Sequence, residues 1–380
     1  MSSLASSVFT LVVFVSSALL VAVQLVSSQL TPRIIAIVFR DPVTKYALTV
    51  FVFTFTLSLT VLVRISNSVP EITGRLAAYS FMASLAVFLF LIDHLGKALR
   101  PSGVLRAVAT LGQEAIESVY PRQEMGSDAT ADDTSVALGQ NPGYTVSNSR
   151  AGVVLAFDLA GLLSLAERAD SLIEMVPQVG DFVAAGDPLF RVYQAGTSLS
   201  IGALRQSVCV GDERTMEQDP TFVFRILVDI ASKGLSPAIN DPTTAVLAID
   251  QVHHLLRTVG SRHLDEGRVR DASGRLRLVY RTPDWEDFVQ LAVTEIRHFG
   301  GQSIQVARRL RAMLENLIQT LPESRAYLLR QELALLHRSA ERFFNEPEDR
   351  ALADVSDFQG VGGSHAHPEE ETRVNEKTQQ

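Results

Sequence analysis

Seven polar residues between positions 213 and 243 are of the types that bind ligands or perform acid–base chemistry. They are Glu213, Arg214, Asp219, Ser236, Asn240, Asp241 and Thr243. An arginine beside a helix N-terminus can hold an anion, whereas carboxylate and amide oxygens are ligands for divalent cations. The segment therefore offers a candidate ligand-binding site. Arg214 would hold an anionic group, or Glu213, Asp219, Asn240 and Asp241 would hold a cation.

A structural role would explain the same residues. Asp241 and Ser236 each precede a proline, which is the pattern of a helix N-cap followed by proline at the first helical position. Asn240 would stabilise the turn between them, and Arg214 would pair with the acidic residues beside it. This interpretation is favoured, because each residue then has a conventional local role.

An enzymatic alternative makes Ser236 a nucleophile with His253 or His254 as its base. The Gly-Xaa-Ser-Xaa-Gly elbow is absent, and so are the phosphate-binding, dinucleotide-binding and His-Glu-Xaa-Xaa-His motifs. The two adjacent histidines project from different helix faces and cannot share a metal ion. We therefore predict no catalytic residue, no metal site and no cofactor. A hydrolase or transferase acting on a lipid or other anionic substrate near Arg214 and residues 236–241 remains the alternative.

Helices must position these residues. Asp219–Lys233 has helical spacing and is followed by Gly234, a residue that favours helix C-termini. A second helix should begin after Asp241 and end near Thr258. A short strand is expected near Arg275–Tyr280. Further amphipathic helices are predicted at Trp285–Phe299, Ser303–Leu321 and Glu323–Phe344.

A compact β/α module is predicted before these helices. Strands are expected at Ala151–Asp158, Ser171–Val176 and Asp187–Val192, with a helix at Leu159–Ala169. The segment 179–189, with its two glycines, resembles the hairpin of biotinyl- and lipoyl-type domains. Those domains carry their cofactor on a lysine, and no lysine occurs between residues 98 and 232. A carrier role is therefore excluded, and a small barrel-like module is the expectation.

Three uncharged apolar runs lie near the N-terminus, at Val8–Ser27, Tyr46–Val63 and Leu76–Ile92. A helix needs about 20 apolar residues to cross the hydrocarbon core. We predict three transmembrane helices, the first retained because it lacks a basic n-region and is too long for a signal peptide. Ser16, Ser17 and Gln24 are expected to pack helices together, and Asp93 and His94 to reach the headgroups.

The predicted fold class is an α-helical integral membrane protein with a mixed cytoplasmic part. The cytoplasmic part comprises a small β/α barrel-like module followed by a mainly helical domain. The expected divisions are a transmembrane domain at 1–99, a connecting helix at 100–124, a linker at 125–149, the module at 150–195, the helical domain at 196–345 and a disordered tail at 346–380.

Charge and cysteine content indicate orientation and partners. Residues 1–106 carry eight basic and three acidic residues, a net of +5; the whole chain is −8, which leaves −13 for the remainder. An acidic soluble part argues against nucleic-acid binding. The basic residues between spans one and two and after span three predict a plasma-membrane protein with a cytoplasmic C-terminal part. The single cysteine, Cys209, suits that reducing compartment.

Four segments together resemble a known family, the bacterial and archaeal membrane proteins of domain of unknown function 2254. The most specific is Ser-Pro-Xaa-Xaa-Asn-Asp-Pro-Xaa-Thr-Ala at 236–245. The others are Ser-Gln-Leu-Thr-Pro-Arg at 28–33, Gly-Asp-Phe-Val at 180–183, and Glu-Arg-Thr at 213–215 with the following Gln-Asp. The resemblance covers about residues 8–345. It implies four spans, so this chain is expected to lack the family's first helix, and it implies no reaction or ligand.

The predicted function is that of a non-enzymatic, homo-oligomeric membrane assembly of scaffold, channel-like or sensory type. Amphipathic helices without a recognisable catalytic set favour it, as do too few spans for a self-sufficient pore. The expected partners are the lipid bilayer, further copies of the chain and an anionic ligand of unknown identity.

Overall fold

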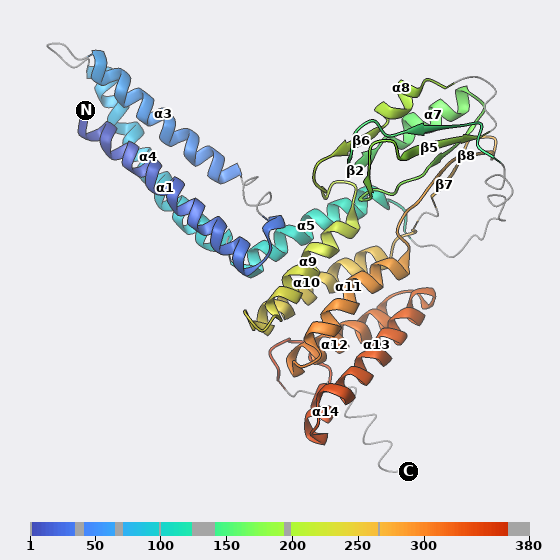
Figure 1. Ribbon diagram of the computed structural model, residues 1–380. Helices are drawn as coiled ribbons and strands as arrows, with labels where there is room; N and C mark the ends of the chain where they lie inside the picture. Colours follow the sequence, from blue (N-terminus) through green and yellow to red (C-terminus); the bar gives the residue numbers. More distant parts are fainter. Residues whose placement is uncertain are drawn as a thin grey trace.

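Three parts make up the computed structural model, which describes residues 2–34, 42–64, 71–98, 100–123, 141–193, 199–264 and 267–363. A block of three long helices stands at one end (Figure 1). An α/β part lies at the other end, and a layered helical body lies beneath it (Figure 1). The helix α5 (Pro101–Val119) leads from the three-helix block into the other two parts.

The three-helix block contains α1 (Ser2–Gln29), α3 (Pro42–Arg64) and α4 (Glu71–Ala98). Each is long and apolar enough to cross a membrane, over Ser6–Leu25, Pro42–Val63 and Ile72–Lys97. Three helices that could serve as the predicted spans are therefore present. Apolar side chains such as Phe51 and Leu91, and a buried Thr54–Ser84 hydroxyl pair 2.8 Å apart, fill the space between them.

The polar residues of these helices behave in two ways. Ser16, Ser17 and Gln24 are exposed on α1, so they do not lie between the three helices of this block. Asp93 lies near the end of α4 and is exposed, and it accepts a hydrogen bond from Lys97 at 2.6 Å. A pair of exposed charges at this end suits the depth of lipid headgroups.

The α/β part contains two sheets rather than one closed barrel. The larger has the order β1-β5-β3-β8-β7, and the smaller β4-β2-β6. Neighbours pair antiparallel except β3 and β8, which are parallel, with Ile173 opposite Leu278. Two short helices accompany the sheets. The elements are β1 (Tyr144–Ser147), β2 (Gly152–Phe157), α7 (Leu159–Arg168), β3 (Leu172–Met175), β4 (Phe182–Val183), β5 (Pro188–Tyr193), α8 (Ile201–Gln206), β6 (Val208–Gly211), β7 (Arg268–Arg270) and β8 (Leu276–Tyr280).

Both sheets draw strands from outside the predicted module at 150–195. β1 comes from the segment predicted as a linker, whose residues 125–140 lie outside the described residues. β6, β7 and β8 come from the segment predicted as mainly helical. The strand pairing therefore does not confirm the barrel-like form. The predicted strands near 151–158, 171–176, 187–192 and 275–280 are present.

The helical body packs around one apolar core. It is built from α5, α9 (Pro220–Gly234), α10 (Pro242–Gly260), α11 (Trp285–Gly300), α12 (Ile304–Thr320), α13 (Glu323–Phe343) and α14 (Pro347–Ala353). Phe224, Leu227 and Ile249 are fully buried at its centre. Leu30, from the turn after α1, is 3% exposed and belongs to the same core. The turn after α1 therefore inserts a side chain into the core of the helical body.

The C-terminal segment corrects one prediction, that of a disordered tail from residue 346. α14 and the loop after it pack against α12, so the tail is ordered through residue 363, and residues 364–380 lie outside the described part. The buried guanidinium of Arg308 donates from Nε to Val355 O and from Nη1 to Gly362 O, both at 3.0 Å. The Asp357 carboxylate accepts from the Gly360 and Gly362 backbones. A buried charge is costly unless it is hydrogen-bonded, and the loop supplies the acceptors for Arg308. These contacts therefore hold the loop against α12.

Candidate functional site

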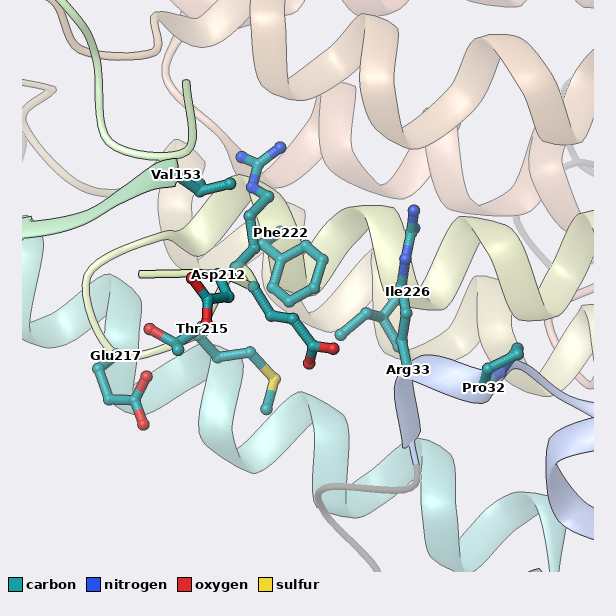
Figure 2. Close-up of a pocket in the computed structure, with 11 residues that line it drawn as sticks. Pro32, Arg33, Val153, Asp212, Thr215, Glu217, Phe222 and Ile226 are labelled. Atoms are coloured by element: carbon teal, nitrogen blue, oxygen red, sulfur yellow. The ribbon is translucent and has the colours of Figure 1, made fainter. Parts of the chain in front are cut away.

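A cavity of about 440 Å³ opens where the membrane block, the α/β part and the helical body meet. We call it the junction pocket. Its lining comes from the short helix η1 (Pro32–Ile34) after α1, from β2, from loop 212–217 and from α9 (Figure 2). In Figure 2 the Phe222 ring lies between a side carrying Asp212, Thr215 and Glu217 and a side carrying Arg33 and Pro32.

Arg214 and Asp219 form the best-buried ion pair beside the pocket. The guanidinium Nε and Nη2 lie 2.8 Å and 2.6 Å from Asp219 Oδ2. Asp219 is only 4% exposed, and its other oxygen caps α9 by accepting from Phe222 N at 3.0 Å. One carboxylate thus satisfies a helix N-terminus and a cation together. The predicted ion-pairing of Arg214 is present in this form.

Gly180 is packed directly against this ion pair. Its backbone φ of +94° lies in the region that glycine favours. A Cβ at this position would clash with Arg214 Nη2 and lie 2.7 Å from Asp219 Oδ2. The glycine of the 179–189 hairpin therefore has two roles, a turn conformation and a close approach to Arg214. Sequence reasoning had assigned it only the first.

Two arginines share the aromatic ring of Phe222. The Arg33 and Arg214 guanidinium carbons lie 5.7 Å and 5.3 Å from the ring centroid. Both distances are within the range of a cation–π interaction. Phe222 lies on the first turn of α9. Its ring therefore connects Arg33, next to the membrane block, with Arg214, in the loop that follows β6.

A chain of ion pairs runs from Arg33 into the helical body. Arg33 pairs with Asp229 on α9, and Arg225 Nε donates to the other oxygen of Asp229 at 2.6 Å. Arg225 also binds both oxygens of Glu295 on α11 at 2.6 Å. The hydrogen bond from Arg225 holds the pKa of Glu295 below its ordinary value, and Glu295 in turn raises the pKa of Arg225. One turn further along α9, Lys233 Nζ donates to Ser27 O at 3.0 Å.

The charge balance of the junction pocket is negative. Each of its two arginines already has a carboxylate partner, Asp219 or Asp229. Asp212 and Glu213 are exposed and, among the described residues, have no hydrogen-bond or ion-pair partner. An anion entering the pocket would have to displace an existing carboxylate, so the arrangement does not favour the anionic ligand expected at Arg214.

The remaining predicted residues lie at the opposite end of α9. This helix has 15 residues, so its ends are on the order of 22 Å apart. Ser236, Asn240, Asp241 and Thr243 sit in the α9–α10 connection or at the start of α10. The seven predicted residues therefore form two separate groups. Arg214 and Asp219 come together, with Glu213 nearby in the loop.

The α9–α10 connection consists of helix-end contacts. Asp241 caps α10, accepting from Thr244 N at 3.0 Å with proline at the first position, as predicted. Ser236 does not cap a helix, because its hydroxyl donates to Lys233 O at 2.7 Å. Asn240 has a φ of +49°, which suits a tight turn. Thr243 is exposed. Gly234 ends α9 where Asp241 O would lie 3.0 Å from an added Cβ.

The two histidines considered as bases have other partners. His253 Nε2 lies 2.9 Å from Asn316 Oδ1, and His254 Nε2 lies 3.3 Å from Gln113 Oε1. Within the described residues there is also no group of three His, Cys, Asp or Glu side chains that could hold a metal ion. The geometry therefore supplies no observation in favour of the hydrolase alternative.

Sequence reasoning missed Phe222, Arg225 and Asp229. A signal was present, because Arg225, Asp229 and Lys233 recur every four residues and so share one face of α9. Such a stripe normally indicates a solvent-facing surface. Here it lies against the turn after α1 and against α11. Arg33 had been used for membrane orientation and as part of the family segment at 28–33, and not as a member of a site.

Comparison with known proteins identifies relatives over most of the chain. A family model described as "Predicted membrane protein (DUF2254)" matches residues 1–316. Uncharacterized proteins of Mycobacterium bovis and of two strains of Mycobacterium tuberculosis are each 26% identical over 364 residues, covering 91% of this chain and 68% of the relative. No solved structure gives a significant match.

Proposed function

Because the chain belongs to the DUF2254 family of predicted membrane proteins, we propose that it is a non-enzymatic, homo-oligomeric membrane assembly of sensory or scaffold type. The observation that carries this proposal is the ion-pair chain Arg33–Asp229–Arg225–Glu295. It runs from the turn after the first span through α9 to α11. A displacement of the first span is thereby passed to two helices of the soluble body.

The soluble body is held to the membrane block at two places. The first is the turn after α1, where Leu30 enters the apolar core and Lys233 binds Ser27 O. The second is α5, which follows α4 and buries Val104, Leu105 and Val108 in the same core. A purely tethered domain would need neither contact. Contacts at both places support mechanical coupling between the membrane block and the helical body.

The proposed location is the plasma membrane, with the soluble body in the cytoplasm. Basic residues gather between the first two spans and after the third, which is the bias of cytoplasmic segments. Large apolar side chains cover the outer faces of all three spans, among them Phe14, Phe53 and Phe90, and these faces can contact either lipid or the spans of another copy. Three helices are too few to enclose a pore, so a channel-like role would also need several copies.

Native mass spectrometry of the full-length protein in nanodiscs tests the assembly. We expect one discrete oligomer of this chain. Only monomers across a wide protein concentration range would contradict the proposal.

Hydrogen exchange tests the coupling. Arg33→Gln should increase amide exchange in α9 and α11, because the ion-pair chain loses its membrane end. Arg106→Gln removes the same charge from an exposed position of α5 and should leave both helices unchanged. Equal exchange in the two variants would argue against transmission through α9.

A further inference from the structure

We propose that the junction pocket binds an organic cation, namely an ammonium group attached to an apolar chain. Neither the family description nor the assembly role proposed above assigns a ligand to this pocket. The proposal is made from lining residues of one chain and does not use the proposed oligomer.

The size and the walls of the pocket fit a small amphipathic molecule. A volume of about 440 Å³ lies within the range of small-molecule sites. Val153, Met216, Phe222 and Ile226 supply apolar walls from three different elements. An alkyl chain can therefore be removed from water here, which a flat acidic surface would not allow.

The sign of the ligand charge follows from which groups are already paired. Arg214 is paired with the buried Asp219, and Arg33 with Asp229. Both guanidiniums also lie over Phe222. In contrast, Asp212 and Glu213 lack partners among the described residues. A cation entering the pocket therefore meets two carboxylates that have no partner in the described part of the chain. An anion meets only arginines whose charge a carboxylate already balances.

The depth of the pocket indicates two sources for such a cation. The first span ends at Leu25 and α1 continues to Gln29, four residues or about 6 Å further. Pro32 and Arg33 follow at once, so the pocket lies close to headgroup depth. An aminophospholipid headgroup and a soluble alkylamine can both present an ammonium group there.

Calorimetry of the full-length protein in an uncharged maltoside detergent tests the charge preference. Hexylamine, protonated at neutral pH, is titrated against hexanoate, an anion with the same number of carbons. We expect wild type to bind hexylamine at least about tenfold more tightly. Equal or tighter binding of hexanoate would overturn the proposal, and that comparison needs no variant.

A double variant then locates the site. Asp212→Asn with Glu213→Gln should weaken hexylamine binding about tenfold or more, since two open carboxylates are lost. The matched control is Glu114→Gln with Glu167→Gln, which removes two exposed carboxylates elsewhere and should bind as wild type does. Equal binding by the two double variants would place the amine outside this pocket and refute the assignment.

Native mass spectrometry from mixed nanodiscs distinguishes the sources. Retention of phosphatidylethanolamine over phosphatidylglycerol by wild type, and its loss in Asp212→Asn/Glu213→Gln, would identify the lipid headgroup as the ligand. Hexylamine binding without lipid retention would identify a soluble amine. Absence of both would overturn the site while leaving the oligomer count, measured in the same spectra, to judge the assembly separately.

Discussion

Arg225 on α9 holds both carboxylate oxygens of Glu295 on α11, with Nη1 and Nη2 each 2.6 Å from an oxygen. Lysine cannot reproduce this two-pronged geometry. We expect Arg225→Lys to lower the free energy of unfolding by about 1 kcal/mol, a value kept small because both side chains are partly exposed. Thermal melting of the full-length protein in detergent measures it.

A matched control exists on α13. Arg330 binds Glu323 in the same two-pronged manner, but both side chains are more than half exposed. Arg330→Lys should therefore leave the melting temperature nearly unchanged. A larger shift from Arg330→Lys than from Arg225→Lys would show that the α9–α11 pair adds no particular stability.

Gly180 should tolerate alanine far less than Gly186. Both have a positive φ, +94° and +96°, so both substitutions carry a similar backbone penalty of about 1 kcal/mol. Only at Gly180 would the new Cβ strike the Arg214 and Asp219 side chains, whereas nothing lies within 4 Å at Gly186. Gly180→Ala should cost about 1–3 kcal/mol more than Gly186→Ala. Equal melting temperatures would mean that the Arg214–Asp219 pair moves aside freely.

His253 should make stability depend on pH. Arg309 can only donate a hydrogen bond, so His253 Nδ1, 3.3 Å from Arg309 Nη2, is the acceptor and the proton lies on Nε2. Burial lowers the pKa of His253 below its ordinary 6.5. The unfolded chain therefore takes up a proton at higher pH than the folded chain does. Stability should fall as the pH drops below about 6.5, until the folded pKa is passed.

Melting temperatures recorded between pH 5 and 8 measure how the stability of the folded protein depends on pH. His253→Gln keeps a donor for Asn316 and should remove this part of the pH dependence. His254→Gln changes the exposed neighbouring residue and should retain it. An identical pH profile for wild type and His253→Gln would contradict the assignment.

Cys209 allows the membrane orientation to be tested without adding a residue. It is the single cysteine of the chain and lies exposed on β6. If the soluble body is cytoplasmic, a membrane-impermeant maleimide should label it only after the cells are permeabilised. In a Cys209→Ser background, Ile72→Cys at the exposed start of α4 should be labelled in intact cells. The reverse pattern would invert the proposed orientation.

Local signals predicted the helices well, and long-range pairing explains what was missed. Asp241 followed by Pro242 marks the start of α10 because capping depends on neighbouring residues alone. The parallel pairing of β3 with β8 joins segments about one hundred residues apart, and no local pattern encodes it. The Arg33–Asp229 pair spans 196 positions. The junction pocket depends on such distant pairs, so its residues could be predicted only in part.

The two attachments of the soluble body have a geometric consequence. A body fixed at one point can swing, whereas a body fixed to two separate spans responds to their difference in position. If the first and third spans rise or sink together, α5 and the turn after α1 move as one and α9 keeps its orientation. If one span slides past the other, α9 must rotate or its contact with Arg33 must break. The proposed coupling would therefore respond to shear between the two spans within the bilayer and not to their common motion.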